Sequence, residues 1–276
     1  RVSDPPTSTP PPATPVRAVA QHTSTPRPAD TPAPTPTVTA TRAPLIALDP
    51  GHGGEDLGAR HFGLDGNMDV HESTINLQLA LRVGARLEAQ GYRVLYIRDG
   101  DHLLNPGYKR DADGDGEASP RDDLILRVDK ANQAGADLLL SLHENAWESQ
   151  NEHLVRSTGG TTTYYCSERE FGQENQRFAT LVHSEVLGAL RRLGYESLDR
   201  GIRIDHTVPG SGGHHFIVLG PVDSVIKRAS QMPGALSEPL FITCDREAAL
   251  MQRDDVQEAL AQAYTRAITT FFEEGP

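Results

Sequence analysis

Residues 45–59, "LIALDPGHGGEDLGA", contain the junction that decides the fold. The four apolar residues at 45–48 predict a short buried strand. The run ends in an acid and a proline, and three glycines then surround a single histidine, His52. In open α/β sheets, ligands bind beyond the carboxyl ends of the strands. We therefore expect His52 to lie at a binding edge.

From residue 45 onward, short apolar runs alternate with amphipathic segments. Apolar side chains recur at helical spacing in four segments, at 75–87, 124–131, 178–186 and 256–271. Six runs predict strands, at 45–49, 92–97, 137–142, 160–166, 215–219 and 235–241. Glycines in "EAQGYRV" and "NQAGADLLL" mark points where a helix ends and a strand begins. This alternation predicts an α/β fold around a mainly parallel sheet.

The first 44 residues differ sharply in composition from the rest. They hold 12 of the 20 prolines and 10 threonines, with almost no large apolar side chain. Such a segment cannot bury enough surface to offset its chain entropy, so we predict a disordered Pro/Thr-rich tether at 1–44 and one folded domain at 45–276. Tethers of this kind are common in exported bacterial proteins, and Arg1 opens directly into polar sequence. We therefore expect that any signal peptide has been removed or left out.

Charge and cysteine content exclude several classes of protein. The tether carries a charge of +2 and the whole chain −12, which leaves −14 on the folded part. This balance argues against nucleic-acid binding, which needs clustered Lys and Arg. No apolar run approaches the ~20 residues that a transmembrane helix needs. Two cysteines, Cys166 and Cys244, are too few for a disulfide scaffold, and the sequence leaves their pairing open.

A second histidine, His143 in "LLLSLHENAW", follows the third predicted strand as His52 follows the first. Both should emerge at the same sheet edge, and a catalytic zinc site needs three protein ligands and one open position. Glu72, at the start of the helix that contains 75–87, is a candidate third ligand, and the neighbouring His71 is its rival. Alternatively, Glu72 only complements the helix N-terminus and His52 is an ordinary loop histidine.

Six sequence blocks, taken in order, resemble the zinc-dependent N-acetylmuramoyl-L-alanine amidases of the amidase-3 type. "ALDPGHGGEDLGA" matches the opening motif of that family, and "HESTINLQLALRVGARLEAQGYRVLYIRDGD" matches its ligand-bearing helix and next strand. "RVDKANQAGADLLLSLHENA" matches the segment of the second histidine. "RGIRID", "FIVLG" and "MPGALSEPLFIT" match later parts. The resemblance covers some 230 residues, from about 45 to 274, and is far more specific than one motif.

The resemblance implies roles for four residues: zinc ligation by His52, Glu72 and His143, and a catalytic acid at Glu238. Pro239 stands where the family usually has glycine, which puts the wall beside Glu238 in doubt. Glu144 is the rival acid, although a strand neighbour of a ligand tends to point away from the metal. The family fold is a six-stranded, mostly parallel mixed sheet flanked by helices, in a single domain.

The implied function is peptidoglycan hydrolysis. A zinc-activated water would cleave the amide between N-acetylmuramic acid and L-alanine, with a glutamate as general base and acid. We expect a monomeric, extracytoplasmic bacterial enzyme that acts on peptidoglycan or muropeptides. Some members of the family are regulated by an activator protein, and the sequence does not show whether this one is. The alternatives are a zinc peptidase or amidohydrolase of other specificity, and a non-catalytic wall-binding module. Degenerate modules usually lose ligands or the acid, whereas all four residues are present here.

A twelve-residue stretch, "DADGDGEASPRD" at 111–122, has the spacing of a calcium loop of the EF-hand type. Oxygen ligands are expected at positions 1, 3, 5, 7 and 12, with glycine at position 6. Gly116 occupies position 6, and the ligand positions hold Asp111, Asp113, Asp115, Glu117 and Asp122. The loop resembles dockerin loops, which end in Asp. We therefore predict a structural Ca²⁺ site, with an acidic surface insertion as the alternative.

Two further segments are weaker candidates. His206, His214 and His215 precede or follow apolar residues, and we expect them in solvent-facing loops bordering the cleft. Residues 222–230, "VDSVIKRAS", suggest a short amphipathic helix, which is the only candidate for a regulatory plug.

Overall fold

The computed structural model describes residues 42–208 and 212–275. Nearly all of the predicted tether at 1–44 therefore lies outside the described residues. A central sheet has the strand order β4-β1-β5-β8-β6-β7. Its strands are β1 (Leu45–Pro50), β4 (Arg93–Tyr96), β5 (Leu138–Leu142), β6 (Thr161–Tyr165), β7 (Asp199–Ile204) and β8 (Gly234–Glu238). Only the β6–β8 pair is antiparallel, which confirms the predicted six-stranded, mostly parallel mixed sheet.

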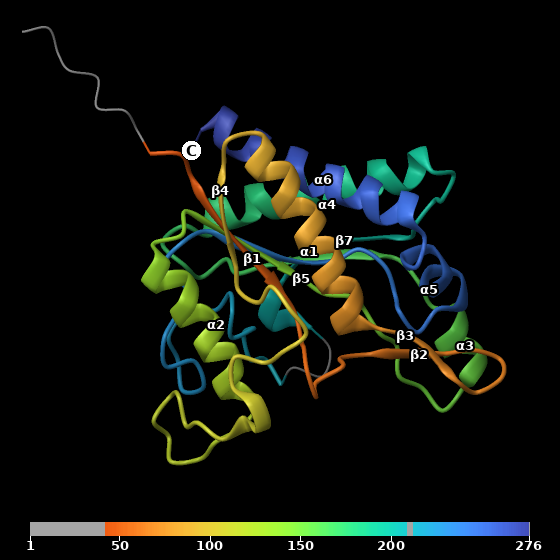
Figure 1. Cartoon of the computed structure of the whole chain (residues 1–276), viewed down its shortest axis with the longest axis horizontal. Coiled ribbons are helices and arrows are strands. Elements are labelled where there is room, and N and C mark those ends of the chain that lie inside the picture. Colours follow the sequence, from red (N-terminus) through yellow and green to blue (C-terminus); the bar gives the residue numbers. More distant parts are fainter. Residues whose placement is uncertain (1–41, 209–211, 276) are drawn as a thin grey trace, which may run out of the picture. The chain divides into compact units, whose positions relative to one another are not determined.

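The other regular elements surround this sheet or extend from its edge (Figure 1). The helices are α1 (Glu72–Ala89), α2 (Pro120–Ala134), α3 (Glu152–Ser157), α4 (Gly172–Arg192), α5 (Asp245–Met251) and α6 (Asp254–Glu274). A hairpin of β2 (Arg60–Phe62) and β3 (Met68–His71) and two 3₁₀ turns, η1 (Pro106–Tyr108) and η2 (Asp205–Thr207), complete the fold. Within the described residues, no helix is long and apolar enough to cross a membrane.

The two faces of the sheet pack against different helices because strand side chains alternate. In β1, Ile46 and Leu48 join the large core that α1, α4 and α6 cover. Leu45 and Ala47 face the smaller core beneath α2. Figure 1 shows α1, α4 and α6 gathered on one side and α2 apart from them. The parallel strands β1, β5 and β8 are neighbours, so their carboxyl ends meet at one edge of the sheet.

Two of the sequence-based assignments are wrong. Residues 215–219, predicted as a strand, form turns, and Gly220 N donates to the Phe216 carbonyl (2.7 Å). Val218 and Leu219 are buried in the core beneath α2, so the apolar run reflects burial without strand pairing. The sixth strand is instead β7, a half-exposed edge strand whose polar sequence gives a weak strand signal. Residues 222–230 form turns and bends, so the predicted plug helix is absent from the described chain.

Both cysteines are buried and free. The pairing that the sequence left open does not occur in this structure. Cys166 follows β6, whereas Cys244 precedes α5.

Candidate metal centre

Strand β1 leads into a glycine-rich loop at the sheet edge. The Gly51 N–H donates to the Leu142 carbonyl at the end of β5 (2.9 Å), which fastens the loop to the neighbouring strand. His52 has a φ of 62°, a left-handed conformation that non-glycine residues rarely adopt, and Gly53 and Gly54 continue the turn with positive φ. Such strain persists only where the surroundings fix it, and it clusters at functional sites.

Arg98, which is fully buried, holds this loop against α1. Its Nε donates to the Pro50 carbonyl at 2.8 Å. Its Nη2 donates to the carbonyls of Gly51 (2.9 Å) and Ser73 (2.7 Å). Because Ser73 lies in the first turn of α1, one guanidinium fixes the loop and the helix start relative to each other.

A second buried arginine, Arg127 of α2, contacts the same loop. It donates to the carbonyls of Pro50 (2.9 Å) and His52 (2.7 Å). The carboxylates of Asp49 and Asp123 lie 2.9 and 2.7 Å from it, so the buried cation is paired on both sides. Burial opposes ionisation of Asp49, but the charges of Arg127 and His143, together with hydrogen bonds from Arg127 and Ser141, hold the Asp49 pKa below its usual value.

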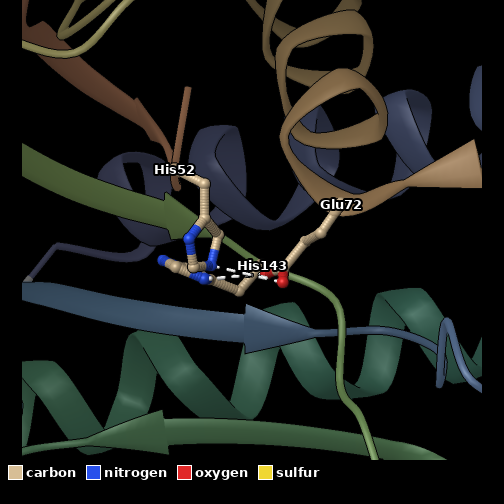
Figure 2. Close-up of side chains that lie close together, drawn as sticks. All are labelled: His52, Glu72 and His143. Carbon is tan, nitrogen blue, oxygen red and sulfur yellow. Dashed lines mark hydrogen bonds and ion pairs between the residues drawn. The ribbon is translucent and has the colours of Figure 1, made fainter. Parts of the chain in front are cut away.

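The structure brings together the three side chains that the resemblance assigns to zinc (Figure 2). His52 Nε2 lies 3.2 Å from Glu72 Oε2, and His143 Nδ1 lies 3.0 Å from Glu72 Oε1. The two imidazole rings meet edge to face, with centroids 5.0 Å apart. They come from the end of β1, the start of α1 and the end of β5, as Figure 2 shows. Side chains far apart along the sequence thus converge at one point.

The carboxylate of Glu72 is buried and held by backbone donors. The N–H of Ala59 donates to its Oε2 (2.9 Å) and the N–H of Glu144 to its Oε1 (3.0 Å). These bonds orient both oxygens toward the histidines. His71, the rival ligand, precedes α1 and its ring instead contacts Ser73 Oγ (3.0 Å). Of the two candidates that the residues alone left open, Glu72 is the one that lies beside both His52 and His143.

The carboxylates around His52 favour its charged form, and the histidines favour the ionised form of Glu72. Asp56 Oδ2 lies 2.9 Å from His52 Nδ1, which leaves Nε2 facing Glu72. Burial lowers the pKa of His52, but the hydrogen bonds to Asp56 and Glu72 outweigh it and raise the pKa to about 10. Burial also opposes ionisation of Glu72, yet the two histidines hold its pKa below the usual range. A histidine oriented by a carboxylate is the usual arrangement around a bound metal.

The donor set and the space around it fit a zinc ion. Tetrahedral nitrogen and oxygen ligands about 2.0–2.1 Å from zinc lie about 3.3 Å from each other. The two histidine nitrogens lie at a similar spacing, 3.2 Å from Oε2 and 3.0 Å from Oε1 of Glu72. The backbone leaves no spare volume: a Cβ on Gly58 would lie 2.6 Å from Glu72 Oε2 and 2.7 Å from His52 Cδ2. A Cβ on Gly51 would collide with the His143 ring.

A cavity of about 300 Å³ opens beside the two histidines. Its lining comprises His52, His143, Glu238 and an apolar wall of Leu124, Phe216, Ile217, Val218 and Leu236. Glu238 ends β8 and therefore lies at the same sheet edge as the histidines. Burial and the negative charge of Glu72 raise the pKa of Glu238 to about 8. Pro239 follows β8 directly, and Glu238 nevertheless lines the cavity.

Glu144, the rival acid, is placed differently. Its side chain is buried, and neither carboxylate oxygen has a hydrogen-bond partner. Burial and the charge of Glu72 raise its pKa well above the usual value. It is absent from the cavity lining, which agrees with the expectation that a strand neighbour of a ligand points elsewhere.

The acidic loop at 111–122 gathers only part of its predicted ligand set. Oxygens of Asp111, Asp113 and Asp122 lie within 4.8 Å of one another. The Asp113 side chain is 1% exposed, and its Oδ2 lacks a hydrogen-bond partner. Arg121 Nη1 lies 3.9 Å from this oxygen and 3.2 Å from Asp115 Oδ2, so Asp115 turns toward the arginine.

Two other members of the predicted loop have alternative surroundings. Glu117 is exposed. Asp122 accepts a hydrogen bond from the Ser119 N–H (2.7 Å) at the start of α2, so it also serves as a helix cap. An acid at this position is therefore useful with or without a cation.

The three loop histidines do not share one environment. His214 is exposed, as expected. His215, expected to face solvent, has only 9% of its side chain exposed, and its Nδ1 lies 2.9 Å from the fully buried Asp205. The solvent-facing assignment is therefore wrong for His215, because a carboxylate on the neighbouring chain segment compensates for its burial.

Sequence reasoning missed the residues that hold the ligands in place. Asp56 carries a local signal, since an acid four residues after His52 on a tight loop can reach back to the ring. Arg127 lies on the helix face next to the apolar Leu124, Val128 and Ala131, but nothing local shows which groups pair with it. Its partners are 4 to 78 residues away, so only the fold reveals them.

The comparisons with known proteins all find members of one family. The model of the amidase-3 family, described as N-acetylmuramoyl-L-alanine amidase, matches residues 46–270. A germination-specific N-acetylmuramoyl-L-alanine amidase of Bacillus subtilis is 30% identical over 234 residues, covering 83% of this chain and 80% of the relative. The uncharacterised protein YqiI of the same organism is 28% identical over 229 residues, covering 83% and 85%.

Solved structures share the fold. The CwlD amidase of Clostridioides difficile, determined in complex with the GerS lipoprotein, superposes with a TM-score of 0.62 at 21% identity. The match covers 84% of this chain and all of that one. The catalytic domain of CwlV, an amidase of Bacillus (Paenibacillus) polymyxa, gives a TM-score of 0.58 at 25% identity, covering 83% and 98%.

Proposed function

Because the chain belongs to the amidase-3 family of N-acetylmuramoyl-L-alanine amidases, we propose that it is a zinc-dependent peptidoglycan hydrolase. The bond cleaved would join the lactyl group of N-acetylmuramic acid to the L-alanine of the stem peptide. The substrate would be peptidoglycan or its muropeptide fragments, reached outside the cytoplasm. In this proposal, residues 1–44 act as a flexible tether and residues 45–276 as the catalytic domain.

One observation carries the zinc proposal: two histidines and a glutamate converge next to a cavity that the carboxyl group of Glu238 also lines. His52, Glu72 and His143 would hold the ion and leave one position free, as catalytic zinc sites require. Bound zinc supplies an activated water near neutral pH and polarises the scissile carbonyl.

The remaining chemistry falls to side chains of this chain. Glu238 takes a proton from the attacking water and passes it to the leaving amine as the carbon–nitrogen bond breaks. The apolar wall of the cavity excludes bulk water from one side of the reacting amide and suits the methyl groups of the lactyl and alanyl units. Arg98 and Arg127 keep the strained loop of His52 in place without touching the substrate.

The experiment that tests this function is mass spectrometry of muropeptides after digestion, with and without a chelator. We expect release of intact stem peptides that begin with a free L-alanine amine, loss of this product after chelation, and its return when zinc is added. Simple peptides of matched length serve as the control substrates. Cleavage of those peptides instead, or undiminished activity in the fully chelated protein, would contradict the proposal.

For the acidic loop, we propose a structural Ca²⁺ site built around Asp111, Asp113 and Asp122. Support comes from the convergence of their oxygens and from the buried Oδ2 of Asp113, which lacks a hydrogen-bond donor. A cation would supply the missing partner, with Asp115 turning from Arg121 to join it. The loop precedes α2, so the ion would stabilise the start of the helix that carries Arg127.

Calorimetric titration of chelator-treated protein with calcium measures this site directly. We expect one binding event and a higher Tm in the wild type. In Asp113→Asn, which keeps the side-chain size but removes the charge, binding should weaken by at least about 10-fold, since ligand charge sets the affinity of such loops. Asp69→Asn, in the distant β2–β3 hairpin, is the control. No heat and no Tm change in the wild type would rule the site out.

A further inference from the structure

A second group of metal-binding side chains lies outside the centre described above. Glu168, in the turn after β6, His206 in η2 and His215 in the following loop place one ligand atom each within 4.8 Å of the others. They belong to three chain segments that meet beyond the ends of β6 and β7. The composition is the same as that of the first centre, with two imidazoles and one carboxylate.

The distances in this cluster are slightly longer than those around a tetrahedral zinc ion. His206 Nδ1 lies 3.7 Å from Glu168 Oε1, and His215 Nε2 lies 3.5 Å from Glu168 Oε2. The two imidazole rings meet edge to face with centroids 4.7 Å apart, as the rings of the first centre do at 5.0 Å. Ligand atoms around a tetrahedral zinc are about 3.3 Å apart, so a small closure would complete the site.

Asp205 fixes the orientation of one of these histidines. Its carboxylate is fully buried, and Oδ1 lies 2.9 Å from His215 Nδ1, while Oδ2 accepts the N–H of Phe216 (3.1 Å). Neutral His215 donating from Nδ1 to Asp205 presents the lone pair of Nε2 to Glu168. This carboxylate–histidine arrangement repeats the one between Asp56 and His52, and it is the usual support of a metal-ligating imidazole.

We propose that Glu168, His206 and His215 form a second divalent-cation site, of the zinc class, separate from the catalytic centre. Imidazole and carboxylate ligands suit zinc better than calcium or magnesium, which prefer oxygen alone. The ion joins the ends of β6 and β7 to the segment that supplies Phe216, Ile217 and Val218 to the cavity wall. It therefore holds one wall of the substrate cavity at a fixed distance from the sheet. The inference does not depend on the proposed activity.

The test is a count of zinc ions per chain by mass spectrometry of metals, after dialysis of the whole protein against zinc. We expect about two per wild-type chain and about one in Glu168→Gln and in His206→Gln. Both side chains are partly exposed, so these variants should fold, and circular dichroism checks that they do. His214→Gln, which changes an exposed neighbour of the cluster, should retain two ions.

A second series separates this site from the catalytic one. Glu72→Gln should lower the count by one ion and leave the other, and Glu72→Gln combined with His206→Gln should bind none. If Glu72→Gln has no effect while His206→Gln removes an ion, the second site stands and the catalytic assignment fails. One zinc per wild-type chain that persists in Glu168→Gln and His206→Gln would overturn the inference. In that case, His206 and His215 would simply form hydrogen bonds with the neighbouring carboxylates, with no bound ion.

Discussion

Replacing Glu238 by glutamine is expected to lower the kcat of amide hydrolysis by about 10²- to 10⁴-fold while zinc binding stays close to wild type. Glutamine keeps the size of the side chain and its hydrogen-bonding capacity, but it neither accepts nor delivers the proton. Glu238 lines the cavity beside His52 and His143 and belongs to none of the metal-binding groups in the described residues. The loss should therefore fall on the chemical step rather than on assembly of the site.

The pKa of this carboxyl group explains why it suits a dual role. Burial and the charge of Glu72 raise the pKa of Glu238 to about 8 in the absence of a cation, which favours the neutral carboxyl group. A divalent cation nearby favours the ionised form and brings the pKa down toward neutrality. A group that titrates near the working pH can act as base and then as acid within one turnover.

The measurement pairs steady-state kinetics on a muropeptide with the zinc content of each variant. Glu144→Gln is the matched control, because it alters a buried glutamate near the same sheet edge that does not line the cavity. We expect this variant to keep a kcat within about 10-fold of wild type, since its carboxyl group does not line the cavity. A large loss in Glu144→Gln with full activity in Glu238→Gln would transfer the acid–base role to Glu144.

Much of the fold was predictable because the central strands are short, continuous apolar runs. β1 and β5 are buried at every position, which is how strands covered on both faces appear in a sequence. The same rule fails at the rim of the molecule. Residues 215–219 are apolar because they cover a core and a cavity, whereas β7 is polar because it is an edge strand. An apolar run in the sequence indicates that its residues are buried. It indicates a strand only where the buried segment is also paired in a sheet.

The site was predictable only in part for a related reason. His52 and His143 each follow a recognisable strand, so parallel topology alone brings them together. Glu72 needed the family resemblance, because His71 fits the sequence pattern equally well. Arg98 and Arg127 donate to backbone carbonyl oxygens of the His52 loop. Every residue has such a carbonyl, so the sequence does not show which ones an arginine will contact. His215 depends on the buried Asp205, whose position the sequence does not indicate.

The glycine at position 58 gives a test of the first metal centre that leaves every ligand unchanged. Gly58→Ala is expected to weaken zinc binding by more than about 100-fold, at least as much as the loss of a residue that supports a ligand. The added Cβ would lie 2.6 Å from Glu72 Oε2 and 2.7 Å from His52 Cδ2, so both ligands must move away from the ion. Hydrolysis should fall in proportion to the zinc that is lost.

The backbone cost of this substitution can be separated from the collision. Gly58 has a φ of +66°, where alanine costs roughly 1–2 kcal/mol of stability whatever its surroundings. Gly66, in the β2–β3 hairpin, has a φ of +79°, and a methyl group added there would meet nothing within 4 Å, so Gly66→Ala carries the strain alone. In the presence of a chelator, Gly58→Ala should lose at least as much Tm as Gly66→Ala, because the collision adds to the strain. Only Gly58→Ala should lose zinc affinity and activity. Equal zinc affinity in the two variants would mean that the ion does not lie between His52 and Glu72.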